Sequence, residues 1–426
     1  MRVAAARGAL ALWLVLGTAA LASAQAAFVH GPTLMDLRAD SVVVEVEAPA
    51  PVAVTVDATV GGEVKRFLST AQRRHFVRLA DLPRDSLVHY TVTAPGFRSE
   101  SGTFRTPPPP TRDAVDFLAY GDNRDGDAPH ASLVRRMATG PGDFVLHLGD
   151  VIPRGRSDAE WNTFLRIANP ILRDRPLVPV LGNHEIADGA RARARYFAHV
   201  VVPAPPATAF HRFDYGPVRI LSLDSNAPMS AGSPQHTFVA RETGRIRREA
   251  SPPLLVVGIH HGPYSSGHHG GLEDLRSSGV LQMLRGAGAA LVLSGHDHIY
   301  ERGQVRSLKY IVTGGGGSPL YTANRREKGQ LAFVPEFHYL ALHATRTTLA
   351  VDALRPDGSA IERCRFTRGG RFACGAGGER GPMLGEAPAA FYLGHRIART
   401  LGLVFGIALV LFLARRLFVL SRREGR

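Results

Sequence analysis

The sequence ALVLSGHDHIYER, residues 290–302, joins a short apolar run to two histidines that are separated by one residue. A continuous apolar run of this length, bounded by turn residues, is typical of a strand buried on both faces. Gly295 follows the run, and a residue without Cβ lets the chain turn sharply and approach another group closely. His296 and His298 therefore come at the point where a buried strand is expected to end.

Four other apolar runs are organised in the same way. They are Val115–Tyr120, Phe144–Leu148, Leu177–Leu181 and Leu254–Ile259. The polar residues that follow them are Asp122, Asp150, Asn183 and His260. Because ligands of open α/β sheets bind at the carboxyl ends of the strands, we expect all these side chains to lie at one edge.

The sequence between these runs indicates helices. Residues 157–168, with Ser157 or Asp158 as the cap, and residues Thr237–Glu249 are the clearest examples. Buried strands that alternate with helices predict an α/β domain, which we place at residues 113–366.

Residues 27–106 have a different pattern. Val42, Val44 and Val46 alternate with more polar positions, and further short strands are separated by turn-rich stretches. This pattern predicts a β-sandwich of the fibronectin type III kind. The prolines at 107–110 then indicate a stiff linker over residues 107–112.

The two ends of the chain indicate export and anchoring. Residues 1–24 have the basic start, apolar core and small residues of a signal peptide. After a linker at 367–396, residues 397–416 predict a transmembrane helix, and residues 417–426 a basic cytoplasmic tail. The alternative for 397–416 is a helix lying on the membrane surface. We expect a single-pass protein of the cell membrane whose α/β domain faces the extracytoplasmic side.

The composition adds two expectations. The net charge is +14, but the arginines are scattered, which speaks against nucleic acid as a structural partner. The two cysteines, Cys364 and Cys374, are candidates for a disulfide in an exported protein, since no CxxC motif or nearby histidine suggests a metal site.

The polar residues at the strand ends have the chemistry of a metal site. Carboxylate, amide and imidazole ligands together suit iron, zinc or manganese better than calcium alone. Six such side chains exceed the needs of one tetrahedral ion. Two ions about 3.5–4 Å apart that share a carboxylate account for the number.

The motifs in order resemble those of the purple acid phosphatases within the calcineurin-like metallophosphoesterases. The resemblance covers residues 113 to about 365 and implies a four-layer α/β/β/α sandwich, a fold that commonly follows a β-sandwich in this family. The segments that carry it are Gly121-Asp122, Gly149-Asp150, Gly182-Asn183-His184-Glu185, His260 and Gly295–Arg302.

The resemblance also implies roles for single residues. One metal would be held by Asp122, Asp150 and His298. The other would be held by Asp150, Asn183, His260 and His296, with Asp150 shared. His184 matches the position that contacts the phosphate, and His268 and His269 fall where family histidines contact substrate.

One part of the family pattern is missing. Purple acid phosphatases have an iron-binding tyrosine three residues after the shared aspartate, where this chain has Pro153. Other metallophosphoesterases have a histidine two residues after the first aspartate, where this chain has Arg124. The first metal is therefore short of one side-chain ligand. Our hypothesis is that Arg124 contacts the substrate phosphate instead.

The expected reaction is hydrolysis of phosphomonoesters by a hydroxide that bridges the two metals. His184 and Arg124 would contact the phosphoryl group, and His269 could protonate the leaving group. A phosphodiesterase acting on nucleotides or lipid headgroups is the first alternative, since the same metal core serves both. An inactive surface binding protein is the second.

Overall fold

The computed structural model describes residues 25–202 and 208–375. Within these two segments, no helix is both long enough and apolar enough to cross a bilayer. The signal peptide, the transmembrane helix and the basic tail expected from the sequence all lie outside the described residues.

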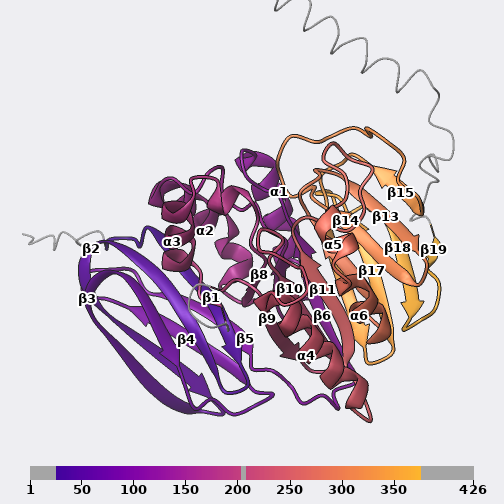
Figure 1. Ribbon diagram of the computed structural model, residues 1–426. Coiled ribbons are helices and arrows are strands. Elements are labelled where there is room, and N and C mark those ends of the chain that lie inside the picture. The colour runs from indigo at the N-terminus through magenta and orange to yellow at the C-terminus, as the bar shows by residue number, and fades with distance from the viewer. Residues whose placement is uncertain (1–24, 203–207, 376–426) are drawn as a thin grey trace, which may run out of the picture.

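The N-terminal unit is built from strands, as the alternation of its sequence predicts. Its strands are β1 His30–Arg38, β2 Ser41–Val60, β3 Glu63–Leu79, β4 Leu87–Thr93 and β5 Glu100–Arg105. The strands β2 and β3 form a long hairpin; β1 pairs with the first part of β2 and β4 with the last part. This arrangement is visible on the left of Figure 1.

The N-terminal unit is joined to the α/β domain by hydrogen bonding. Met35 of β1 pairs in parallel with Leu177 of β8. One twelve-stranded sheet therefore runs through both parts of the chain, where the sequence led us to expect a separate sandwich. The reason is that β1 leaves one edge free of β2, and that edge meets the outermost parallel strand of the α/β domain.

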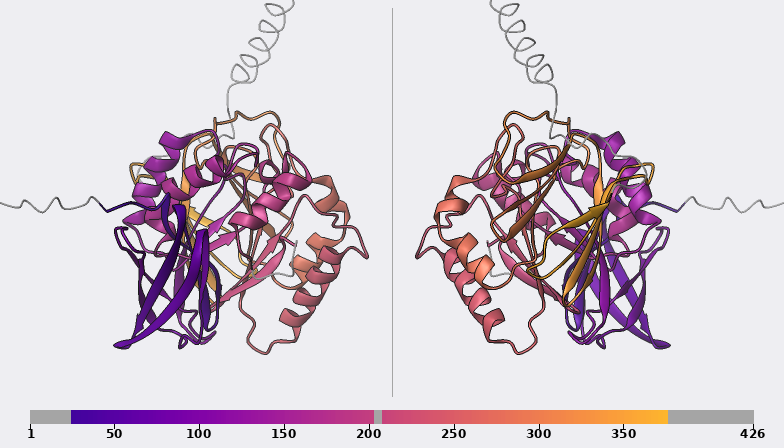
Figure 2. Two further views of the ribbon diagram at one scale, coloured as in Figure 1. Left: turned by 90° about the vertical axis from the view of Figure 1, so that its left-hand side faces the viewer. Right: turned by 90° about the vertical axis from the view of Figure 1, so that its right-hand side faces the viewer.

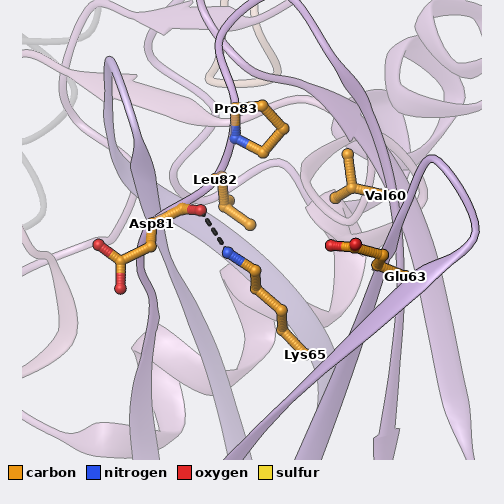
Figure 3. Close-up of a pocket in the computed structure, with 6 residues that line it drawn as sticks. All are labelled: Val60, Glu63, Lys65, Asp81, Leu82 and Pro83. Carbon is orange, nitrogen blue, oxygen red and sulfur yellow. Dashed lines mark hydrogen bonds between the residues drawn. The ribbon is translucent and has the colours of Figure 1, made fainter.

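A pocket lies in the N-terminal unit between the hairpin end and the segment that follows β3 (Figure 3). Lys65 is its cationic group, and its amine donates a hydrogen bond to the carbonyl oxygen of Asp81 at 2.6 Å. The lining contains none of the histidines at the strand ends. This pocket is not the metal site that the motifs predict.

The α/β domain contains two sheets. The first joins β6 Ala114–Tyr120, β7 Val145–His147, β8 Leu177–Pro179, β16 Tyr339–Thr345, β17 Thr348–Leu354, β18 Ala360–Thr367 and β19 Ala373–Gly375 to the N-terminal strands. The second contains β9 His211–Tyr215, β10 Val218–Leu223, β11 Leu254–Ile259, β12 Leu291–Ser294, β13 Tyr300–Val305, β14 Leu308–Thr313 and β15 Gln330–Val334. Strands β6, β7 and β8 are parallel, and so are β10, β11, β12 and β14.

Helices cover the outer face of each sheet (Figure 2). One group is α1 Asp127–Ala138, α2 Asp158–Leu172 and α3 Ala190–His199, with the short 3-10 helix η1 His184–Ile186. The other group is α4 Pro234–Arg248, α5 Glu273–Ser277 and α6 Val280–Gly286.

The side chains of alternate strand residues explain the layers. Phe117 of β6 and Leu293 of β12 belong to the core between the sheets. Their neighbours Leu118 and Val292 belong to the two outer cores beneath the helices. Strands buried on both faces produce the continuous apolar runs seen in the sequence. The expected α/β/β/α sandwich is confirmed.

The expected disulfide forms at the end of the described chain. Cys364 of β18 and Cys374 of β19 are directly opposite one another, and their sulfur atoms are bonded.

Candidate metal centre

The backbone places three of the expected ligands in an unusual conformation. Asp122, Asp150 and His296 have φ values of 62°, 56° and 70°, in the left-handed region that residues with a Cβ rarely adopt. Such strain persists where the surrounding structure holds it, and it gathers at functional sites. Each of the three residues follows a glycine after a strand, so the chain turns as it leaves the sheet.

Gly295 and Gly182, which precedes Asn183, are required by close approach. A Cβ on Gly182 would come within 2.3 Å of the backbone nitrogen of Asp150, and one on Gly295 within 2.3 Å of Asp122 Oδ2. Larger residues would push the ligand-bearing loops apart. The glycines that the sequence shows after the apolar runs are thus part of the site.

The expected ligands lie close to one another. Nε2 of His260 lies 2.9 Å from Asn183 Oδ1 and 3.3 Å from Asp150 Oδ1. The ligand atoms of Asp122, Asp150 and His260 lie within 4.8 Å of one another, and all three residues are buried.

The remaining two ligands, His296 and His298, border the same cluster. The His296 ring centroid is 5.1 Å from that of His260, and His298 Nε2 is 3.8 Å from Asp122 Oδ1. Five separate strand ends therefore deliver their side chains to one place.

The histidines are oriented by carbonyl oxygens. His260 Nδ1 lies 2.8 Å from the Leu148 oxygen, and His298 Nδ1 lies 2.7 Å from the Pro319 oxygen. A carbonyl oxygen only accepts, so Nδ1 carries the proton and Nε2 turns a lone pair toward the cluster. Nε2 of His298 is buried and has no hydrogen-bond partner. This arrangement is typical of metal-binding histidines.

The electrostatics also fit cations. Burial, together with the nearby charge of Asp150, raises the pKa of Asp122 well above its ordinary value. Burial, reinforced by the surrounding histidines, lowers the pKa of His296. A buried carboxylate pair among neutral imidazoles is stabilised by a positive ion placed between them. The donor set therefore fits two metal ions of the zinc, manganese or iron type.

Glu185 ties together the loops that carry Asp150 and Asn183. Its carboxylate is buried and accepts hydrogen bonds from the backbone nitrogens of Gly182 at 2.7 Å, Asp150 at 3.0 Å and Val151 at 2.8 Å. The sequence placed Glu185 within a motif but did not indicate this role, which depends on two loops meeting.

Arg124 lies beside the cluster. Its Nε donates to Asp150 Oδ2 at 3.1 Å, and its Nη1 donates to Asp125 Oδ2 at 2.8 Å. Pro153 contributes only its carbonyl oxygen, which holds Nδ1 of His184. The structure thus puts a guanidinium beside the first metal position, and Pro153 adds no side-chain ligand there.

The expected substrate histidines differ in their positions. His184 Nε2 lies 3.9 Å from Asp150 Oδ2, and the His269 ring centroid lies 4.2 Å from that of His296. His268 contacts the rings of His269 and Tyr321, with centroids 4.9 and 5.7 Å away.

Two residues near the cluster were not singled out from the sequence. His261 has its ring centroid 4.0 Å from that of His296, and its Nδ1 is 2.6 Å from Ser225 Oγ. The sequence signal for His261 was that it directly follows the candidate ligand His260. Tyr321 stacks on His298 with centroids 4.1 Å apart. No motif or spacing pointed to Tyr321.

Comparisons with known proteins indicate a protein family for the α/β domain. Residues 116–300 match the family model of the calcineurin-like phosphoesterases. Among curated proteins, the chain is 26% identical to purple acid phosphatase 21 of Arabidopsis thaliana, over 62% of this chain and 63% of that protein. It is 25% identical to a nucleotide pyrophosphatase/phosphodiesterase of Hordeum vulgare, over 51% of this chain and 73% of that protein.

Two solved structures share the fold. Purple acid phosphatase PPD1 from yellow lupin aligns with a TM-score of 0.69 and 16% identity, over 79% of this chain and 74% of that chain. A structure of PhoD aligns with a TM-score of 0.64 and 13% identity, over 85% of this chain and 94% of that chain.

The resemblance inferred from the motifs is confirmed: residues 116–300 match the calcineurin-like phosphoesterase family model, and the curated proteins to which the chain is similar include purple acid phosphatases. The chain spans 63% and 55% of the length of the first two curated relatives, so its activity and its substrates are proposals.

Proposed function

We propose that this protein hydrolyses phosphomonoesters at a dinuclear metal centre. The observation that carries the proposal is the meeting of six candidate ligand side chains from five strand ends, with Asp150 beside Asp122 and His260. Neutral imidazoles and strained carboxylates held in this way are prepared for cations.

The six ligand side chains fall into two sets, one for each metal ion. Asp122, Asp150 and His298 would hold one metal, and Asp150, Asn183, His260 and His296 would hold the other. Two bound cations supply a nucleophile from water near neutral pH and offset charge on the phosphoryl oxygens.

The residues around the ligands act on the substrate. His184, with Nδ1 held by Pro153, turns Nε2 toward the phosphoryl group. Arg124, whose Nε donates to Asp150 Oδ2, offers charged donors beside the same carboxylate. His269, beside His296, is placed to give a proton to the departing oxygen.

A phosphodiesterase is the second candidate. It is favoured by the similarity to the barley nucleotide pyrophosphatase/phosphodiesterase. A site for diesters needs room for a substituent on each side of phosphorus, whereas a monoester presents a free terminal phosphate.

A paired assay separates the candidates. Protein reconstituted with zinc or manganese is given p-nitrophenyl phosphate and bis(p-nitrophenyl) phosphate. The proposal predicts faster turnover of the monoester, and near-complete loss in Asp150→Asn. Preference for the bis-ester would support the second candidate. No turnover of either ester by metal-loaded protein would instead favour an inactive binding protein.

We also propose that the enzyme is exported and anchored, with the catalytic domain on the extracytoplasmic side. The sequence at 1–24 and 397–416 supports this, and the bond between Cys364 and Cys374 suits an oxidising compartment. Carbonate extraction of membranes tests it, because an anchored protein stays in the pellet and a peripheral one is released.

A further inference from the structure

The backbone of His269 is bound to a buried carboxylate that comes between two candidate metal ligands. Asp297 is 1% exposed and lies between His296 and His298 in the chain. Its Oδ1 accepts a hydrogen bond from the His269 backbone nitrogen at 3.0 Å, and its Oδ2 accepts one from the Gly270 nitrogen at 3.3 Å. One side chain therefore sets the position of His269 relative to the two ligands.

The residues that precede His269 pack on the same carboxylate. Ser265 Oγ donates to Asp297 Oδ2 and accepts from the Gly267 nitrogen at 3.1 Å. A Cβ on Gly267 would come within 2.4 Å of Asp297 Cγ, so a larger residue would push the chain away from the carboxylate. Asp297 thus accepts three hydrogen bonds from residues 265–270, which we call the histidine segment.

A second buried carboxylate fixes the middle of the histidine segment. Glu301 Oε2 accepts from the Ser266 nitrogen at 2.6 Å, and Glu301 Oε1 accepts from the Ser266 hydroxyl at 3.2 Å. The Asn324 nitrogen also donates to the Ser266 carbonyl oxygen at 2.9 Å. Because the segment is already ordered in this way, it loses little conformational entropy when one of its side chains contacts a ligand.

The side chain of His269 is exposed although its backbone is held. Its ring centroid lies 4.2 Å from that of His296. An accessible imidazole is therefore fixed next to a candidate metal ligand, on a segment whose own buried groups face Asp297 and Glu301.

An imidazole in this position suits one step of ester hydrolysis. The oxygen of a water molecule forms a bond to phosphorus and gives up a proton, while the bond to the ester oxygen breaks and its electron pair stays on that oxygen. An alkoxide leaves slowly unless it receives a proton, whereas p-nitrophenolate is stable without one. A proton from His269 converts the alkoxide to an alcohol, and the proton released by water restores the imidazole.

We propose that Asp297 is a positioning residue that holds His269 against the leaving oxygen, and that the site therefore acts on alkyl phosphomonoesters. This inference rests on the proposed function. An asparagine at position 297 would keep one acceptor oxygen and turn an NH₂ group toward the histidine segment. At least one of the backbone N–H groups of His269 and Gly270, or the hydroxyl of Ser265, would then lose its acceptor, and His269 would shift.

The test compares glycerol 2-phosphate, an alkyl ester, with p-nitrophenyl phosphate on the zinc-loaded full-length protein. In Asp297→Asn, kcat for glycerol 2-phosphate should fall by about 10–100-fold, and kcat for p-nitrophenyl phosphate should change little. KM for both esters and the zinc content should remain those of the wild type. His269→Ala should show the same selective loss, and the double variant should lose no more than His269→Ala alone.

Asp143→Asn is the matched control. This carboxylate accepts from the Asp116 nitrogen at 3.1 Å just before β7, at the end of the parallel strands opposite the ligands, so neither ester should be affected. Ser265→Ala is a milder change, because it removes one donor to Asp297 and leaves the residues between His296 and His298 intact. It should show the same selective loss of kcat at smaller size, and it decides the matter if Asp297→Asn binds less zinc.

An equal loss of kcat on both esters, or a change in KM alone, in zinc-loaded Asp297→Asn and in Ser265→Ala overturns the inference. Wild-type turnover of p-nitrophenyl phosphate then leaves the proposed function standing. A zinc-loaded wild-type protein that hydrolyses neither ester overturns both.

Discussion

Replacement of Glu185 by glutamine should loosen the two loops that carry Asp150 and Asn183. The carboxylate accepts backbone hydrogen bonds from Gly182 and Asp150 on Oε2, and from Val151 and Ile152 on Oε1. A glutamine side chain has only one acceptor oxygen, so two of these buried N–H groups lose their partner. Each orphaned donor costs about 1–3 kcal/mol. The metal-free protein should therefore lose about 2–6 kcal/mol of unfolding free energy.

Urea unfolding of the metal-free protein measures this loss, and a zinc titration measures its effect on the site. Because Glu185 positions ligands without being one, we expect zinc affinity to fall by about 10–100-fold. Glu336→Gln is the matched control: its side chain is 42% exposed and pairs with Arg355, so the change should be below about 1 kcal/mol. A Glu185→Gln protein as stable as wild type, with unchanged zinc affinity, would refute the role of Glu185.

Three further outcomes are expected. Burial raises the pKa of Glu45 from 4.5 to about 7, so the folded state retains a proton that the unfolded state releases. The free energy of unfolding should therefore fall by about 3 kcal/mol as pH rises from 4.5 to 7. Urea unfolding should show that Glu45→Gln removes most of this pH dependence. Cys364 and Cys374 are separated by 10 residues, and reduction of their bond should lower the free energy of unfolding by about 2–3 kcal/mol. Thermal unfolding with and without reductant measures this loss, and the double serine variant should show no effect of reductant. Arg124→Ala should raise KM for a phosphomonoester on the order of tenfold or more; steady-state kinetics with both constants unchanged would exclude a phosphate contact.

The site was largely predictable because each ligand follows a strand buried on both faces. Such strands leave continuous apolar runs, and in four of the five a glycine after the run marks the turn that places the next side chain. Residues Asp122, Asp150 and His260 could therefore be assigned without knowledge of the tertiary structure. The role of Glu185 and the stacking of Tyr321 on His298 could not, because they arise where segments distant in sequence meet.

The helices were predicted less completely, for local reasons. Helix α4 begins at Pro234, three residues before the expected start, and Ser233 Oγ caps it by accepting from the His236 nitrogen at 3.2 Å. Serine followed by proline is a recognised start signal. Helix α1 was not expected, although the spacing of its buried residues Leu133 and Met137 is helical.

The pairing of β1 with β8 could not be predicted from the sequence either. Their contact depends on the docking of the N-terminal unit on the α/β domain, and docking leaves no periodic signal in the sequence. The all-β character of residues 30–105 was nevertheless evident from the alternation of valines with polar residues.

The most direct test of the central claim is the number and position of bound metal ions. Protein reconstituted with zinc or manganese should contain two equivalents per chain, with anomalous diffraction peaks on either side of Asp150. His298→Ala should lose the ion beside Asp122 and keep the one beside His260. A wild-type protein that holds one ion or none, with all six side chains intact, would contradict the account.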